Sequence, residues 1–285
     1  RRGVRMKIGF NEGTAMKNSS LKTDLELTEK YGYDYIEIRL DMLREYLKTN
    51  TLEDLKQFFK NSHLKPYALN SIEDITFCNE EELQRKKVEL EWACKIAKEL
   101  HNPYIVIVPT INDKVKKYTE QEAEEDSVRV LKEFADISEK YNVSLAFEPI
   151  GFEHCAVRSI QQCWNILKKV DRPSVGMVVD AFNLYLYNGL KDLQDLEKVD
   201  TEKIFIFHID DSEAGDIRQL DQCHRVWPGD GVIPLDKLLR TLYKKGFDKI
   251  ASIELFRPEY WDLPTEDIVR IGYEKTKNIL EKYYK

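Results

Sequence analysis

Residues 204–211 read Ile-Phe-Ile-Phe-His-Ile-Asp-Asp, an apolar run that stops at a histidine followed by two carboxylates. Such a run is typical of a buried strand, here with His208 at its end. Three other runs end in the same way, at residues 144–148 (SLAFE), 174–180 (SVGMVVD) and 250–254 (IASIE). Each run therefore carries one candidate metal ligand at its tip, which gives the set Glu148, Asp180, His208 and Glu254.

Side chains at every second position of a strand point to the same face. In these runs the positions that share a face with the polar tip are mostly small, as at Ala146, Gly176 and Ser252. The opposite positions carry large apolar residues such as Phe205 and Phe207. The first face suits the interior of a closed sheet and the second suits a covering of helices, so we expect the four polar tips to converge inside a barrel.

The rest of the chain alternates between strand and helix patterns. Further strands are predicted at residues 6–11, 35–39, 66–70 and 104–110. Helical spacing or capping residues predict helices at residues 21–31, 51–61, 120–141, 190–199 and 235–245, with others beginning near Asn79, Ser159 and Thr265. Gly32 is a predicted helix C-cap, and the pairs Asn79 with Glu82 and Ser159 with Gln162 are predicted capping boxes.

Eight strand and helix alternations in 285 residues predict an α/β protein that forms a single (β/α)8 TIM barrel, with its active residues at the strand C-termini. We expect one domain over residues 6–285, and we interpret residues 1–5 as an upstream extension or an expression remnant. A doubly wound open sheet is the alternative architecture. It does not explain why one face of four strands is small and ends in ligand residues.

Composition narrows the function class. The net charge of −7 with scattered basic residues argues against a nucleic-acid surface. No apolar stretch approaches the roughly 20 residues of a membrane span. The five cysteines lack a Cys-x-x-Cys pair, which argues against a disulfide framework and against a thiolate metal site. We expect a cytoplasmic protein that acts on a small molecule, and homo-oligomerisation is left open.

Two glutamates, an aspartate and a histidine suit one divalent ion such as manganese, zinc, cobalt or magnesium. Each residue alone has a plainer interpretation, because a histidine after an apolar run is commonly a hydrogen-bonded core residue and strand-end acids commonly cap helices. Four ligand types with matching parity at four strand tips favour the metal site.

Five motifs extend this pattern, and they read FEPIG (147–151), VVDAF (178–182), FHIDD (207–211), HRVWPGDGVIPLD (224–236) and IELFRPEYW (253–261). Together they resemble the xylose-isomerase-like barrels of the sugar isomerase and epimerase superfamily, and within it most closely the inosose isomerases of myo-inositol catabolism. The resemblance extends over essentially the whole chain after Met6.

The resemblance implies that Glu148, Asp180, His208 and Glu254 bind one divalent metal. It implies an enzyme that isomerises or epimerises an α-hydroxyketone, an inosose or a ketose, by proton transfer through a metal-bound enediolate. Glu148 and Glu254 would then also serve as the acid and the base. The implied partner is a small polyol ketone or sugar.

Substrate contacts are predicted at five further residues. Arg225 and Trp227 fit the family pattern in the loop after the seventh strand, where the alternative is a surface loop with one anchoring aromatic. Asn70 and Glu37 point inward by parity and are candidates for polyol recognition, although either could be an interior polar residue bonded to a neighbour. Asn183 occupies a position where relatives commonly place a histidine. It can hydrogen-bond a hydroxyl but cannot titrate near neutrality.

Gly229 and Gly231, in the sequence Pro-Gly-Asp-Gly, most simply supply turn geometry, and a phosphate cradle is the weaker interpretation. Two rival functions are also weighed. A multinuclear-metal nuclease of the AP-endonuclease-like barrel type needs more histidines at strand ends, whereas the third strand here ends in Asn70 and the fourth in Pro109 and Thr110. A catalytically silent polyol-binding protein would have little need of two glutamates beside a metal.

Overall fold

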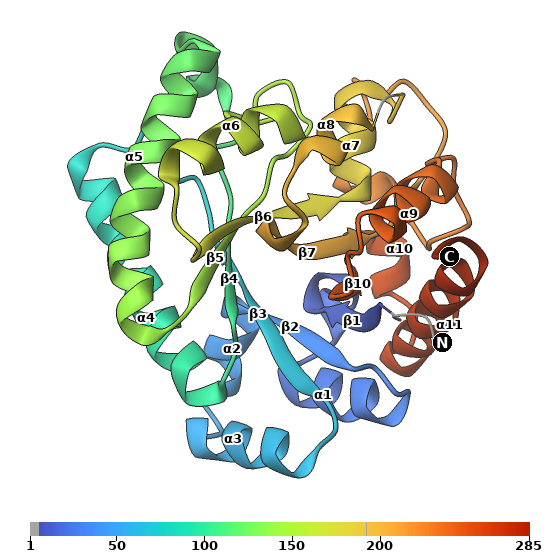
Figure 1. Ribbon diagram of the computed structural model, residues 1–285. Helices are drawn as coiled ribbons and strands as arrows, with labels where there is room; N and C mark the ends of the chain where they lie inside the picture. The colour runs from blue at the N-terminus through green and yellow to red at the C-terminus, as the bar shows by residue number, and fades with distance from the viewer. Residues whose placement is uncertain (1–5, 192) are drawn as a thin grey trace. The chain divides into compact units, whose positions relative to one another are not determined.

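The computed structural model describes residues 6–191 and 193–285, so the predicted extension at residues 1–5 lies outside the described residues. Eight strands form a closed barrel in the order β1-β10-β7-β6-β5-β4-β3-β2. The strands are β1 (Lys7–Asn11), β2 (Tyr35–Arg39), β3 (Lys65–Ile72), β4 (Tyr104–Ile107), β5 (Ser144–Phe147), β6 (Val175–Asp180), β7 (Ile204–Ile209) and β10 (Ile250–Ile253). The predicted TIM barrel is confirmed (Figure 1).

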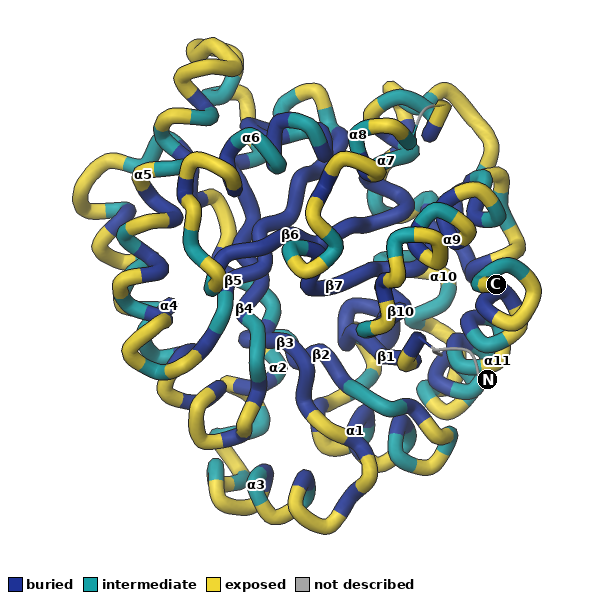
Figure 2. Tube along the Cα trace, viewed as in Figure 1, coloured by how far each residue is buried: buried dark blue, intermediate teal, exposed yellow. Residues whose placement is uncertain are grey.

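Helices follow the strands along the chain, and most of them bury one face and expose the other (Figure 2). They are α1 (Leu21–Lys30), α2 (Leu40–Tyr46), α3 (Leu52–Asn61), α4 (Glu80–Leu100), α5 (Glu120–Ser138), α6 (Ile160–Val170), α7 (Ala181–Asn188), α8 (Gln194–Lys198), α9 (Leu235–Lys244), α10 (Pro258–Trp261) and α11 (Thr265–Tyr283). The sequence did not predict α2, α7 or α10. None exceeds eight residues, which is too short for a clear helical period.

The structure tests the three helix caps that were predicted from the sequence. Asn79 and Glu82 form the reciprocal capping box that begins α4, and Gly32 has the positive φ of 86° expected after α1. The predicted box at Ser159 is only half formed. The Ser159 hydroxyl accepts from the Gln162 N–H, but the Gln162 side chain accepts from the Arg158 N–H and donates to the Ala156 carbonyl. Gln162 thus satisfies the incoming loop rather than the cap residue.

The chain groups into two compact units, and the prediction of one domain over residues 6–285 stays a prediction. The first unit comprises Arg1–Tyr67, Asp180–Phe182 and Ile206–Lys285, of which residues 1–5 are not described. Its strands pair in parallel, with Asn11 beside Glu37, Gly9 beside Ser252, and Ser252 beside His208. The predicted parity therefore holds here, because these registers place Asn11, Glu37, Ser252 and His208 on one face.

The second unit comprises Ala68–Val179 and Asn183–Phe205. Its strands place Tyr104 beside Ser144 and Ala146 beside Gly176, on the face that parity assigned to the interior. Phe205 was predicted on the outer face, and that prediction is wrong. Its ring stacks on Tyr104 with centroids 4.8 Å apart, and a Cβ at Gly176 would lie 2.6 Å from the same ring. The missing side chain of Gly176 leaves the room that Phe205 fills.

A search of the described residues for membrane-spanning helices found none that is both long and apolar enough to cross a bilayer.

Candidate metal centre

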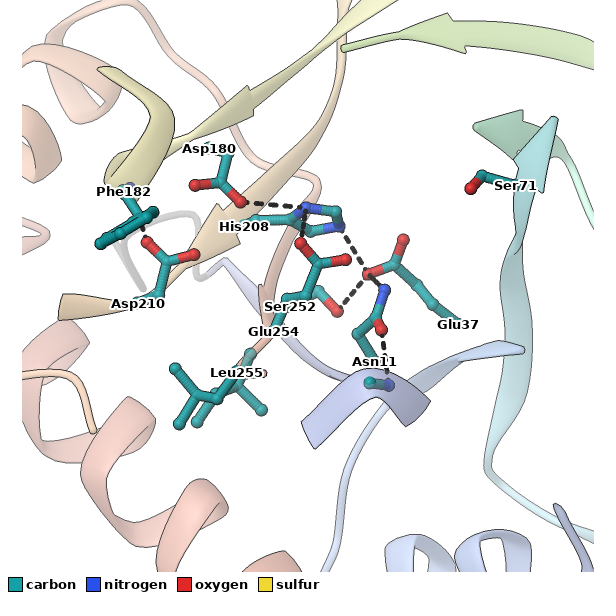
Figure 3. Close-up of polar contacts among 12 residues, drawn as sticks. Asn11, Glu37, Ser71, Asp180, Phe182, His208, Asp210, Ser252, Glu254 and Leu255 are labelled. Atoms are coloured by element: carbon teal, nitrogen blue, oxygen red, sulfur yellow. Dashed lines mark hydrogen bonds and ion pairs between the residues drawn. The ribbon is translucent and has the colours of Figure 1, made fainter. Parts of the chain in front are cut away.

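His208 lies on β7, where every residue is buried, and its ring presents its two nitrogens to different partners. Nε2 lies 2.8 Å from Glu37 Oε2. Nδ1 lies 3.5 Å from Asp180 Oδ2 and 3.4 Å from Glu254 Oε1. Figure 3 shows the imidazole between Glu37 on one side and Asp180 and Glu254 on the other. The ring is thus oriented by one carboxylate and directed toward two others.

The four predicted metal ligands lie together. One ligand atom from each of Glu148, Asp180, His208 and Glu254 falls within 4.8 Å of the others. Bonds from a divalent ion to nitrogen or oxygen are about 2.0–2.2 Å, which places neighbouring ligand atoms about 3–4 Å apart. The separations at His208 Nδ1 fit that geometry, and a buried set of three acids and a histidine suits a borderline-hard cation.

The four residues differ in their access to solvent. Asp180 and His208 are 0% exposed, whereas Glu148 and Glu254 are each 6% exposed. All four residues are therefore buried, and the two glutamates are the members of the set that retain any exposed surface.

Arg225 is buried and contacts two of the proposed ligands, Asp180 and Glu254. It is 1% exposed, and its Nη1 donates to Asp180 Oδ2 at 3.0 Å, to Asp210 Oδ2 and to the Glu254 carbonyl at 3.2 Å. Burial alone would lower the pKa of the guanidinium, but the carboxylates of Asp180, Asp210 and Glu254 raise it above the ordinary value. Arg225 thus follows the seventh strand as predicted, but it is buried among acids, and its contact with substrate stays a prediction.

Asp210 was missed by sequence reasoning, although the second acid of FHIDD was a visible signal. It is fully buried, its Oδ1 accepts from the Phe182 N–H at 2.7 Å, and its Oδ2 accepts from Arg225. Burial and the neighbouring charge of Asp180 raise the pKa of Asp210 well above its usual range, and Arg225 opposes that rise. Asp210 thus ties Arg225 to the first turn of α7.

The next residue, Asp211, fixes the loop that contains the Pro-Gly-Asp-Gly sequence. Its carboxylate accepts from the N–H groups of Ser212, Gly229, Gly231 and Ile233 at 2.9–3.0 Å. Gly229 has a φ of 94°, and a Cβ at Gly231 would lie 2.3 Å from the Ser212 carbonyl oxygen. Both glycines therefore serve turn geometry, as predicted. Their N–H groups are engaged by Asp211, which contradicts the phosphate-cradle alternative.

A family model described as xylose isomerase-like TIM barrel matches residues 25–279. The chain belongs to this family. The inosose isomerase of Bacillus velezensis (strain DSM 23117 / BGSC 10A6 / LMG 26770 / FZB42) is 40% identical over 282 residues, which cover 98% of this chain and 99% of that protein. The inosose isomerase of Bacillus licheniformis (strain ATCC 14580 / DSM 13 / JCM 2505 / CCUG 7422 / NBRC 12200 / NCIMB 9375 / NCTC 10341 / NRRL NRS-1264 / Gibson 46) is 42% identical over 283 residues, or 98% and 100% of the two chains.

Among solved structures, a crystal structure of the IOLI protein with a binding zinc atom superimposes with a TM-score of 0.94. It is 40% identical to this chain, and the match covers 98% of this chain and 99% of that one. The chain is therefore homologous to the inosose isomerases over nearly its whole length, and a structural relative is known with zinc.

The other predicted substrate residues of this family member have varied surroundings. Glu37 is fully buried behind His208, where its Oε2 also accepts from Ser252 and Asn11. Burial alone would raise the pKa of Glu37, but His208, Ser252 and Asn11 hold it below the usual value. These contacts favour the interpretation of Glu37 as an interior polar residue bonded to its neighbours.

Trp227 is buried and stacks on Tyr260 of α10, with ring centroids 4.3 Å apart and planes 10° from parallel. Asn183 is buried in the first turn of α7, and Asn70 is half-buried on β3. Substrate binding by Trp227, Asn183, Asn70 and Glu37 stays a prediction. Sequence reasoning named the proposed ligands and their neighbours Glu37 and Arg225, but it missed Asp210, Asn11 and Ser252, which contact those neighbours.

Proposed function

We propose that this chain is a divalent-metal-dependent isomerase or epimerase of an α-hydroxyketone, an inosose or a ketose, that acts by proton transfer. The observation that carries the proposal is the buried group Glu148, Asp180, His208 and Glu254, with ligand atoms within 4.8 Å of one another. The identity of 40–42% with inosose isomerases over 98% of the chain supports a small, sugar-like substrate.

The four residues of this group would hold the ion. Manganese, zinc, cobalt and magnesium all suit the donor set, and the zinc in the IOLI structure supports zinc as the first ion to test. When bound, the ion supplies Lewis-acid stabilisation of negative charge that develops on the substrate oxygens.

Glu148 and Glu254 would move the proton. Isomerisation of an α-hydroxyketone requires a base that removes the proton from the hydroxyl-bearing carbon, an acid that delivers a proton to the former carbonyl carbon, and transfer of the hydroxyl proton to the former carbonyl oxygen. Epimerisation instead returns the proton to the same carbon from the opposite face. A carboxylate near a divalent cation stays ionised, and its second oxygen can accept the proton. The slight exposure of these two glutamates, compared with the enclosed Asp180 and His208, supports their assignment as the acid and the base.

Proton exchange with solvent tests the proposal. The zinc-loaded enzyme is incubated in D2O with a panel of inososes and ketohexoses, and recovered substrate and product are examined by NMR and mass spectrometry. We expect deuterium at the carbon next to the ketone. Turnover with the original hydrogen fully retained would count against proton transfer, unless a shielded base returns the same proton.

Variants resolve that exception. Glu148→Gln and Glu254→Gln keep side-chain size and one ligand oxygen but lose the basic carboxylate, and each is expected to lower kcat by about 10²- to 10⁴-fold. Glu153→Gln, at an exposed position after β5, is the matched control and should retain the wild-type rate. If both site variants isomerise at the wild-type rate, neither glutamate is the base and the assignment fails.

The same samples separate the rival functions. Cleavage of abasic DNA with no turnover of any ketone would favour the nuclease. Saturable binding of a polyol with neither exchange nor turnover would favour the silent binding protein. Among residues 6–191 and 193–285, one group of candidate ligands meets, which favours a mononuclear site over a multinuclear one.

A further inference from the structure

We propose that Glu37 is a positioning residue, which holds His208 in the tautomer with its proton on Nε2 and thereby makes Nδ1 the metal-binding nitrogen. The inference rests on the proposed metal site and adds a residue outside the ligand set. It also assigns a specific atom of the histidine, which the donor set alone leaves undetermined.

The orientation begins at the end of β1. The backbone N–H of Gly13 donates to Asn11 Oδ1 at 2.9 Å. A backbone N–H can only donate, so the side-chain atom that faces it must be the amide oxygen. The amide nitrogen Nδ2 is therefore the atom that faces Glu37, and it donates to Glu37 Oε2 at 3.3 Å. Asn11 and Glu37 are register partners on β1 and β2, which places their side chains within hydrogen-bond distance of each other.

Glu37 Oε2 is consequently an acceptor. An amide N–H₂ group only donates, and the Ser252 hydroxyl, 2.5 Å away, is placed to donate to the same oxygen. The third contact of Oε2 is His208 Nε2 at 2.8 Å. An acceptor oxygen at that distance requires a proton on the ring nitrogen, so Nε2 carries the N–H.

The other ring nitrogen then points to the proposed ligands. Nδ1 lies 3.5 Å from Asp180 Oδ2 and 3.4 Å from Glu254 Oε1, on the opposite side of the ring from Glu37 (Figure 3). A metal-bound histidine commonly donates its second N–H to a carboxylate, which fixes the ring and strengthens the ligand. Glu37 has this position, and it is fully buried.

The first test is the tautomer of the wild-type protein. Protein labelled with ¹⁵N-histidine is studied by two-bond ¹H–¹⁵N correlation, and the His208 signal among the five histidines is identified by its absence in His208→Asn. We expect the zinc-loaded protein to show a proton on Nε2 and zinc-shifted Nδ1. A proton on Nδ1 with zinc on Nε2 would overturn the proposal without recourse to any variant.

The second test is zinc affinity, measured by competition with a chelator. Glu37→Leu removes the acceptor and is expected to weaken zinc binding by about 10- to 100-fold, the usual effect of losing such a partner. Glu37→Gln keeps an acceptor oxygen and should recover most of the affinity and the Nε2–H tautomer. Ser252→Ala removes a different contact of the same carboxylate and should change the affinity by less than Glu37→Leu does.

A purely structural role predicts a different pattern. It would lower the thermal midpoint of Glu37→Leu while the folded fraction binds zinc with wild-type affinity and keeps the Nε2–H tautomer, and that result would refute the positioning role. Glu12→Gln, at a buried glutamate of the same unit outside the proposed ligand set, controls for the loss of a buried acid. Wild-type protein that binds no divalent ion would instead refute the proposed function.

Discussion

Asp24 and Glu12 form a buried acid pair, and replacing Asp24 by asparagine should change how stability depends on pH. Both side chains are fully buried. Glu12 Oε1 accepts from the Arg39 N–H at 3.0 Å, and Asp24 Oδ1 accepts from the Ser19 hydroxyl at 2.5 Å. Burial and the neighbouring Asp24 carboxyl raise the pKa of Glu12 well above its ordinary value.

Burial also raises the pKa of Asp24 from 3.8 to about 6. Because the folded protein holds this proton more tightly than the unfolded chain, the stability that Asp24 contributes is fully present below about pH 4 and is lost as the pH rises through about 6. On going from about pH 4.5 to about pH 7.5, stability is lost mainly below the folded-state pKa of about 6. That interval is about 1.5 pH units at about 1.4 kcal/mol per unit, so the loss is roughly 2 kcal/mol.

Asp24→Asn cannot titrate, so its stability relative to the wild type should rise by roughly 2 kcal/mol over the same pH range. Asp24→Asn also removes the neighbouring charge that raises the pKa of Glu12. The ionisation of Glu12 therefore costs less stability in the variant, which increases the difference from the wild type at the higher pH. The free energy of unfolding is measured by urea titration of metal-free protein at both pH values. Glu26→Gln, at an exposed position of the same helix, should stay within about 0.5 kcal/mol of the wild type at each. A difference between Asp24→Asn and wild type that is equal at the two pH values would refute the reasoning.

Three further predictions concern the site and its surroundings. A dialysed and reloaded sample should contain about one divalent ion per chain by mass spectrometry, and a value near two would support the nuclease. Arg225→Ala should lower the free energy of unfolding by about 3–5 kcal/mol, because it leaves Asp180 and Asp210 buried beside each other without the guanidinium; wild-type stability would contradict this. Asp211→Ala should cost about 1–3 kcal/mol and speed amide exchange at Gly229 and Gly231, whereas unchanged exchange would mean that other contacts hold the loop.

The sequence predicted those parts of the fold in which the direction of each side chain follows from the regular repeat of a strand or a helix. Tyr35–Arg39 was predicted as a strand with the bounds that the structure has. Glu254 and His208 could be placed on one face because side chains alternate along strands, and parallel strands bring their C-terminal ends to one rim. The same rule failed for Phe205. Its direction depends on a neighbour without a side chain, Gly176, and alternation along its own strand does not contain that information.

The residues around the proposed ligands are placed by short strand pairings and loops, which leave no repeating pattern in the sequence. Arg225 returns to the acids because β9 (Arg225–Val226) pairs antiparallel with β8 (Asp211–Ser212), which sets Ser212 opposite Arg225. Two residues per strand are too few for a pattern, and the loop between them gives no indication of its direction. The sequence does contain one signal: Asp210 follows a buried strand whose residues other than His208 are apolar, and a buried carboxylate needs a donor or a cation. Such an acid predicts a buried cation nearby, but Lys203, Arg218 and Arg225 are each flanked by an apolar residue, so this signal alone does not select Arg225. Charge balance in the interior therefore predicts that a cation is buried here, and the antiparallel pairing of β8 with β9 decides that it is Arg225.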